Sequence, residues 1–141
     1  MSPKALLPLT VGFVALAFSL PVSAAEGDPA AGKRVYNQCA ACHSMAKDKN
    51  GLGPSLHGVV GRKAASADGF KNYSPAMQKS EIVWTEENLA KYLEDPKGFI
   101  PGNRMIMNGL KREEDRVNVI AFIKQASQGD GGGSSGGSSG E

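Results

Sequence analysis

Cys39-Ala40-Ala41-Cys42-His43 is the stretch of sequence that decides the fold. Two thiols separated by two residues, with an imidazole directly after the second, form the C-x-x-C-H pattern at which a c-type haem is attached. The thiols add across the vinyl groups of the porphyrin, and the imidazole reaches the iron as an axial ligand. We therefore predict one covalent haem c, bound through Cys39 and Cys42, with His43 on the iron.

Three other interpretations compete for the two cysteines. A thioredoxin-like C-x-x-C needs a βαβ context, and no strand pattern flanks Cys39 or Cys42. A zinc site needs a fourth ligand, and His57 adds only one further nitrogen. A disulfide can form after export, but a loop of two residues makes poor structural use of one. Export itself favours haem attachment, which takes place outside the cytoplasm.

The sequence before this motif begins like an export signal. Lys4 is followed by an apolar stretch over residues 5–20 and then by Val22-Ser23-Ala24-Ala25. The small residues there fit cleavage after Ala25 or one residue earlier. An uncleaved membrane anchor is the alternative, although the stretch is shorter than the roughly 20 apolar residues that a span needs. We expect residues 1–25 to be a cleaved signal peptide that delivers the protein to the periplasm.

The opposite end has a composition that cannot form a core. Residues 129–141 are seven Gly, four Ser, one Asp and one Glu, which indicates a disordered tail or linker. Residues 26–128 must therefore hold the folded domain. The chain has 16 basic and 14 acidic residues, and loss of Lys4 with the leader leaves 15 against 14, a net charge of +1. This balance excludes a nucleic-acid-binding protein, which needs a strongly basic face.

Three segments of the body have helical patterns. Asp28 and Pro29 suit the start of a first helix, as N-cap and first helical residue. Thr85 can cap a second helix, which Pro96 ends. A third is expected over residues 112–126. The positions expected on the buried faces are Gly32, Val35, Tyr36 and Cys39, then Leu89, Tyr92 and Leu93, and finally Val119, Phe122, Ile123 and Ala126.

The first two predicted helices are joined by an unusually long irregular connection. Residues 44–83 have no lasting periodicity, and a compact domain rarely tolerates such a connection. Three short helices in a chain with 6% aromatic residues would also make a thin core. A bound cofactor solves both problems. We predict an all-α fold of three main helices and long loops around one haem.

The second axial position on the iron decides the function. An open position favours ligand binding or peroxide chemistry, whereas a Met raises the potential and favours electron transfer. Met105 and Met107 lie in residues 101–107, a rigid turn that enters an extended segment. Because successive side chains of an extended chain alternate in direction, we expect only one of the two to face the iron. Packing is the alternative role for either.

From residue 27 to residue 126 the chain resembles the class I cytochromes c, the family of mitochondrial cytochrome c and the small soluble bacterial carriers. Besides C-x-x-C-H, the motifs that carry the resemblance are Gly53-Pro54-Ser55-Leu56-His57-Gly58, Gly61-Arg62-Lys63, Trp84, Tyr92-Leu93-Glu94-Asp95-Pro96-Lys97 and Pro101-Gly102-Asn103-Arg104-Met105. The resemblance implies the cytochrome c fold and an electron carrier that is not an enzyme.

The resemblance also implies how the iron is held. In that family the Met directly after the Pro-Gly-x-Lys turn is the sixth ligand, which maps onto Met105 opposite His43. Met107 then takes the place of a family aromatic packed against the haem edge. The carbonyl of Pro54 would orient His43, as hydrogen-bonding partners of metal ligands do. The other contacts implied are Tyr92 donating to the Met105 sulfur, Asn103 holding that ligand's loop, and Arg62, Tyr73 and Trp84 bonding a buried haem propionate.

Two further placements follow from the same resemblance. Gly32 and Tyr36 of the first helix would cross Val119 and Phe122 of the last. His57 is a candidate for a bis-His ligand, but its position in the family pattern implies packing in a loop.

The partners implied are redox proteins. A monomeric periplasmic carrier of this kind would take single electrons from a quinol–cytochrome reductase and pass them to a terminal oxidase or a photosynthetic reaction centre. The alternative is the haem domain of a larger dehydrogenase or peroxidase, fused or in a complex, with the Gly/Ser tail as its linker. Gln38 and Gly98 replace lysines that border the haem edge in mitochondrial members, so the docking face is less basic.

Overall fold

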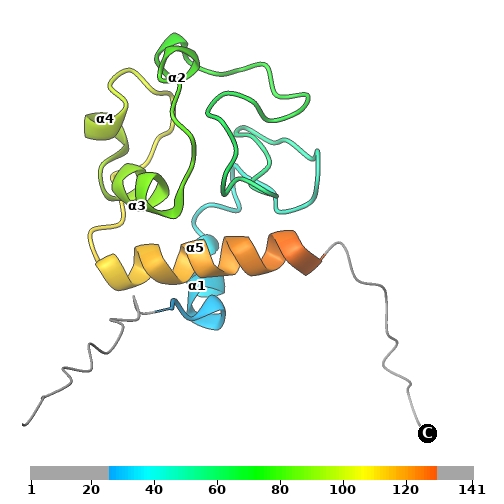
Figure 1. Cartoon of the computed structure of the whole chain (residues 1–141), viewed down its shortest axis with the longest axis vertical. Coiled ribbons are helices and arrows are strands. Elements are labelled where there is room, and N and C mark those ends of the chain that lie inside the picture. The colour runs from blue at the N-terminus through cyan, green and yellow to red at the C-terminus, as the bar shows by residue number, and fades with distance from the viewer. Residues whose placement is uncertain (1–25, 130–141) are drawn as a thin grey trace, which may run out of the picture.

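The computed structural model describes residues 26–129, so the expected signal peptide and all but the first residue of the expected tail lie outside the described residues. Within this range the chain forms helices and no strands, which confirms the all-α class (Figure 1). The helices are α1 (Pro29–Tyr36), α2 (Pro75–Lys79), α3 (Glu86–Glu94), α4 (Pro96–Phe99) and α5 (Glu113–Gln128). The three predicted main helices correspond to α1, α3 and α5. None of the helices over residues 26–129 is both long and apolar enough to cross a membrane.

Local capping chemistry sets where these helices begin. The Asp28 carboxylate accepts a hydrogen bond from the Ala30 amide at 2.8 Å, and Thr85 Oγ1 accepts from the Asn88 amide at 3.1 Å. The start of α5 differs, because Arg112 occupies its N-cap position without a side-chain hydrogen bond. Three acidic residues in the first turn of α5 stabilise that end by interacting with the helix dipole.

The two short helices α2 and α4 were not predicted. Pro96 was expected to end the second helix, but it also starts α4, because Asp95 Oδ1 accepts from the Gly98 amide at 3.1 Å. Ser74 caps α2 in the same way, ahead of Pro75. A proline after a capping residue therefore begins a helical turn here, even where the turn is too short to show periodicity.

The first helix is shorter than its predicted buried face. The helix α1 ends at Tyr36, and the chain continues to Cys39 and His43 as consecutive turns. The Cys39 amide donates to the Tyr36 carbonyl at 2.7 Å, and the His43 amide donates to the Cys39 carbonyl at 2.9 Å. The two cysteines are thus presented by a turn that follows α1 rather than by α1 itself.

The helices α1 and α5, the first and last helices of residues 26–129, cross in close contact (Figure 1). A Cβ on Gly32 would overlap the carbonyl oxygen of Asn118 and lie 2.9 Å from the Phe122 Cβ. The rings of Tyr36 and Phe122 pack with centroids 5.1 Å apart. The Asp28 amide also donates to Asn118 Oδ1 at 2.8 Å, which joins the start of α1 to α5. The crossing anticipated from Gly32 and Tyr36 is present.

Replacing Gly32 with Ala should therefore destabilise the protein, because the added methyl group forces the two helices apart. Overpacking of this kind lowers the free energy of unfolding by ~1–3 kcal/mol. The better helix propensity of Ala offsets at most about 1 kcal/mol of this loss. The midpoint of guanidinium unfolding, followed by far-UV circular dichroism, measures the net loss. Gly129→Ala is the control, since nothing lies within 4 Å of its Cβ position. A Gly32→Ala variant as stable as Gly129→Ala would contradict the tight crossing.

The apolar core is assembled from helices and loops together. Its buried members include Val59 and Ala64 from the long connection, Trp84 and Tyr92 around α3, and Val119 from α5. Partly buried side chains pack against this cluster, and they are Val35, Cys39, Met45, Leu56, Val60, Ala76, Met77, Ile82, Ala90, Leu93, Phe99, Met105, Met107 and Phe122. Cys39 of the motif and four methionines therefore pack against the same apolar core.

Candidate functional site

The cysteine-histidine turn is held from both sides. The Tyr36 hydroxyl at the end of α1 donates to the His43 carbonyl at 3.0 Å. The Gly53 amide donates to the Cys42 carbonyl at 2.8 Å, which ties the turn to the following loop. The Cys39 thiol is partly buried and the Cys42 thiol is exposed, and both are free. The backbone thus fixes the turn without depending on a disulfide.

The imidazole of His43 is oriented as a metal ligand should be. Its Nδ1 lies 2.7 Å from the carbonyl oxygen of Pro54. A carbonyl can only accept, so Nδ1 carries the proton and Nε2 keeps its lone pair. Burial lowers the pKa of His43, which favours the neutral ring. A Cβ on Gly53 would overlap the ring, so glycine at that position is needed for this arrangement.

The chemistry around the thiols disfavours the competing interpretations. Burial raises the pKa of the Cys39 thiol, with a smaller contribution from Cys42, whereas a redox-active C-x-x-C needs a lowered pKa. Over residues 26–129, no cluster of three or more His, Cys, Asp or Glu side chains could hold a metal ion. The thioredoxin-like and zinc interpretations therefore have no support in this part of the chain.

Asn103 organises the segment that carries the candidate sixth ligand. Its Nδ2 donates to the carbonyls of Pro96 at 2.6 Å and Ile100 at 2.9 Å. Its Oδ1 accepts from the Met105 amide at 2.9 Å. One side chain thereby links α4 to the backbone of Met105 and sets the point at which the chain becomes extended.

Tyr92 of α3 points at the sulfur of Met105. Its hydroxyl lies 3.8 Å from Met105 Sδ and 3.3 Å from Asn103 Oδ1. The ring is buried between Trp84 and Phe99, with centroid distances of 5.0 Å and 6.3 Å. Burial raises the pKa of Tyr92 to about 12, so the hydroxyl keeps its proton at neutral pH and acts as a donor.

The expectation that alternation separates Met105 from Met107 is wrong. Both side chains are half-buried and pack against the core, whereas Ile106 between them is 99% exposed. The alternation of an extended chain has a period of two, so residues two apart share a face. Alternation therefore places both methionines inward and does not choose between them. The polar contacts do distinguish them, because Met105 alone of the two contacts Tyr92 and Asn103 within the described residues.

The resemblance implies that Arg62, Tyr73 and Trp84 bond a haem propionate, and each has a hydrogen-bond donor without an acceptor in residues 26–129. Arg62 donates to the carbonyls of His57 at 3.0 Å and Ser55 at 2.8 Å, and burial lowers the pKa of its guanidinium. The Tyr73 hydroxyl accepts from the Ala67 amide at 3.1 Å, and nothing in residues 26–129 accepts its proton. The Trp84 side chain is largely buried, and its indole N–H donates no hydrogen bond within that range. A carboxylate fits this donor set.

Some residues that shape the site were not predicted from the sequence. Ser55 is buried and its hydroxyl donates to the Ala46 carbonyl at 2.8 Å, which folds the loop after the motif. Tyr36 was predicted only as a core residue, yet its hydroxyl contacts the His43 carbonyl. Hydrophobic periodicity carries no information on such polar contacts between loops.

Comparison with known proteins agrees with this geometry. Residues 29–127 match the family model for cytochrome c. The chain belongs to the cytochrome c family. Cytochrome c2 of Rhodomicrobium vannielii is 49% identical over 100 residues, which cover 70% of this chain and 79% of that protein. Cytochrome c2 of Blastochloris viridis is 44% identical over 118 residues, covering 83% and 91%.

A solved structure shows the same cytochrome c fold. Cytochrome cH from Methylobacterium extorquens superposes with a TM-score of 0.66 at 41% sequence identity, covering 70% of this chain and 99% of that structure. Membership of the family establishes one covalent haem c, for which Cys39 and Cys42 supply the attachment motif. The predictions of a class I c-type cytochrome, of its cofactor and of an electron carrier rather than an enzyme are confirmed.

Proposed function

We propose that this cytochrome c is a periplasmic one-electron carrier whose single haem c is held by His43 and Met105. The observation that carries the proposal is the convergence of Tyr92 and Asn103 on Met105, together with the Pro54 carbonyl on His43. When bound, haem c supplies the one-electron couple between Fe(III) and Fe(II).

The chain's own residues favour rapid electron transfer and exclude other reactions at the iron. Pro54 fixes the tautomer and direction of His43, so little rearrangement is needed when the charge changes. The Tyr92 hydroxyl donates toward the Met105 thioether, and the rings of Trp84 and Phe99 pack against the Tyr92 ring that carries this hydroxyl. Arg62, Tyr73 and Trp84 offer donors to a propionate. If His43 and Met105 held the iron from its two sides, they would leave no open position for a substrate.

The proposal includes the organisation of the whole chain. Residues 1–25 form a signal peptide that is cleaved on export, residues 26–128 form the cytochrome c domain, and residues 129–141 form a disordered tail or linker. The monomeric carrier would receive electrons from a quinol–cytochrome reductase and deliver them to a terminal oxidase or a reaction centre. The likeness to the cytochromes c2 of Rhodomicrobium vannielii and Blastochloris viridis supports a free-standing carrier over a domain of a larger dehydrogenase or peroxidase.

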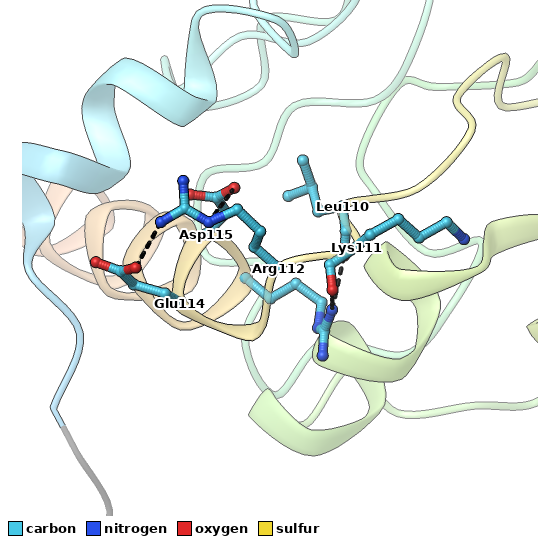
Figure 2. A network of polar contacts seen from close by, with 6 residues as sticks. Leu110, Lys111, Arg112, Glu114 and Asp115 are labelled. Carbon is cyan, nitrogen blue, oxygen red and sulfur yellow. Dashed lines mark hydrogen bonds and ion pairs between the residues drawn. The ribbon is translucent and has the colours of Figure 1, made fainter.

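Docking is expected at exposed basic residues close in sequence to Met105. They are Lys97, Arg104, Lys111 and Arg112. Figure 2 shows that Arg112 is engaged locally, with its guanidinium 2.6 Å from Glu114 Oε2 and 3.9 Å from Asp115 Oδ2. These carboxylates offset much of its charge, so Lys97 and Arg104 should contribute more to long-range attraction.

Electron transfer from an acidic-faced partner should therefore slow as ionic strength rises, because salt screens this attraction. Charge reversal by Lys97→Glu should lower the second-order rate constant at low salt and flatten its salt dependence. Lys33→Glu, an exposed lysine on α1, is the control for net charge. Stopped-flow reduction measures both effects. Equal losses in the two variants, or a rate that is flat with salt, would contradict docking at this face.

A further inference from the structure

The extended segment that carries Met105 is held mainly at its two ends. Within the described part of the chain, the backbone of residues 106–109 makes no hydrogen bond. Asn103 holds the beginning of the segment through the Met105 amide. The free energy needed to displace Met105 from its place therefore depends on how firmly the C-terminal end of the segment is attached.

The far end of the segment lies on the C-terminal end of α3. The Leu110 amide donates to the Leu93 carbonyl at 2.6 Å, and Lys111 Nζ donates to the Glu94 carbonyl at 2.9 Å. Gly109 has φ +88°, and a Cβ there would overlap the Glu94 carbonyl oxygen. These contacts satisfy two of the carbonyl groups that a helix leaves unpaired at its C-terminus.

A buried cation on α5 holds the same end from the other side. Arg116 is 8% exposed and is the one charged residue that is buried among residues 26–129. Its Nη1 donates to the carbonyls of Leu110 at 2.7 Å and Lys111 at 3.0 Å, and Figure 2 shows dashed lines reaching these two residues. Its Nη2 lies 3.8 Å from Glu94 Oε2. A buried guanidinium is tolerated only with such partners, so the arrangement is strongly specified.

We propose that Arg116 is a positioning residue for Met105, anchoring the end of its segment to α5 through the carbonyls of Leu110 and Lys111. The helix α5 is a firm support, because it packs against α1. The anchor matters most in the oxidised protein, since a thioether favours Fe(II) over Fe(III). This inference rests on the proposed role of Met105 as a ligand.

The test is a titration of the ferric holoprotein with imidazole, which must displace Met105 to bind. Removing Arg116 in Arg116→Met should raise the imidazole affinity about tenfold or more, because hydrogen bonds from a charged group to the segment are lost. Lys124→Met is the matched control. Lys124 is also a cation of α5 paired with a glutamate of α3, with its Nζ 2.6 Å from Glu86 Oε1, but it is far along the helix from the segment. Its imidazole affinity should stay within about twofold of wild type.

A milder variant covers the case in which Arg116→Met yields no holoprotein. Arg116→Lys keeps the cation but cannot reproduce the planar fork, so it should give an intermediate rise in imidazole affinity. Amide hydrogen exchange at Leu110 should also speed up, since that amide bonds to α3 at the anchored end. An imidazole affinity that stays at the wild-type value in both Arg116 variants would overturn the positioning role, whether or not Leu110 exchange changes.

Met105→Ala separates this inference from the function on which it rests. If Met105 is the ligand, this variant should bind imidazole more tightly than any Arg116 variant, because nothing has to be displaced. An unchanged affinity in Met105→Ala would overturn Met105 ligation itself. A raised affinity in Met105→Ala with wild-type affinity in both Arg116 variants would overturn only the role of Arg116.

Discussion

Replacing Met105 with Ala should abolish the sulfur-to-iron charge-transfer band of the ferric protein and lower its reduction potential. Thioether ligation stabilises Fe(II) relative to Fe(III), so its loss favours the oxidised state. The same variant should bind carbon monoxide in the reduced state, because the position that Met105 fills becomes open. Optical spectra and voltammetry of the purified holoprotein measure these changes.

Met107→Ala is the matched comparison, because Met107 lies on the same inward face as Met105. It should keep the charge-transfer band and lose only packing, at a cost of ~2–5 kcal/mol for a fully buried methionine and less for this half-buried one. If the band survives in Met105→Ala and vanishes in Met107→Ala, the ligand is Met107. The contacts of Tyr92 and Asn103 would then have misled the assignment.

Removing both thiols in a Cys39→Ala/Cys42→Ala variant should yield little or no mature folded protein. Cys39 packs against the apolar core, and the haem that it attaches would complete that core between loops that have few helices of their own. Loss of a group that binds only the folded state removes its whole binding free energy from stability. The yield of exported protein and its far-UV circular dichroism report the outcome.

Ala41→Ser provides the control for this experiment, since Ala41 lies between the two cysteines, is exposed and leaves both thiols intact. It should fold and take up haem normally, with a change in stability within about 0.5 kcal/mol. A double-cysteine variant that exports well and unfolds cooperatively without haem would show that side chains alone make a sufficient core.

Local chemistry explains what could be predicted from the sequence. The C-x-x-C-H motif spans five consecutive residues, and the Asp28 and Thr85 caps bond amides no more than three residues away in sequence. The crossing of Gly32 with α5 was implied by the resemblance to the class I cytochromes c, and it agrees with the buried faces predicted from periodicity. Each of these inferences depends on neighbouring residues or on a resemblance carried by contiguous motifs.

Contacts between distant segments explain what was missed. Arg116 bonds carbonyls of a loop that has no periodicity, and no sequence pattern marks which arginine of a charged run is buried. Arg112 and Arg116 belong to the same charged run over residues 111–116, yet Arg112 is exposed and Arg116 is buried. The residues alone left Met105 and Met107 as alternatives, and the choice of Met105 came from the resemblance, since Tyr92 lies thirteen residues earlier on another element.

The optical spectrum of the wild-type holoprotein, recorded with and without reductant and carbon monoxide, tests the central claim most directly. The claim is that His43 and Met105 fill both axial positions of one haem used for electron transfer. It predicts a sulfur-to-iron charge-transfer band in the ferric protein at neutral pH and a ferrous spectrum that carbon monoxide leaves unchanged. A ferric protein without that band, or a ferrous protein that binds carbon monoxide readily, would contradict the claim.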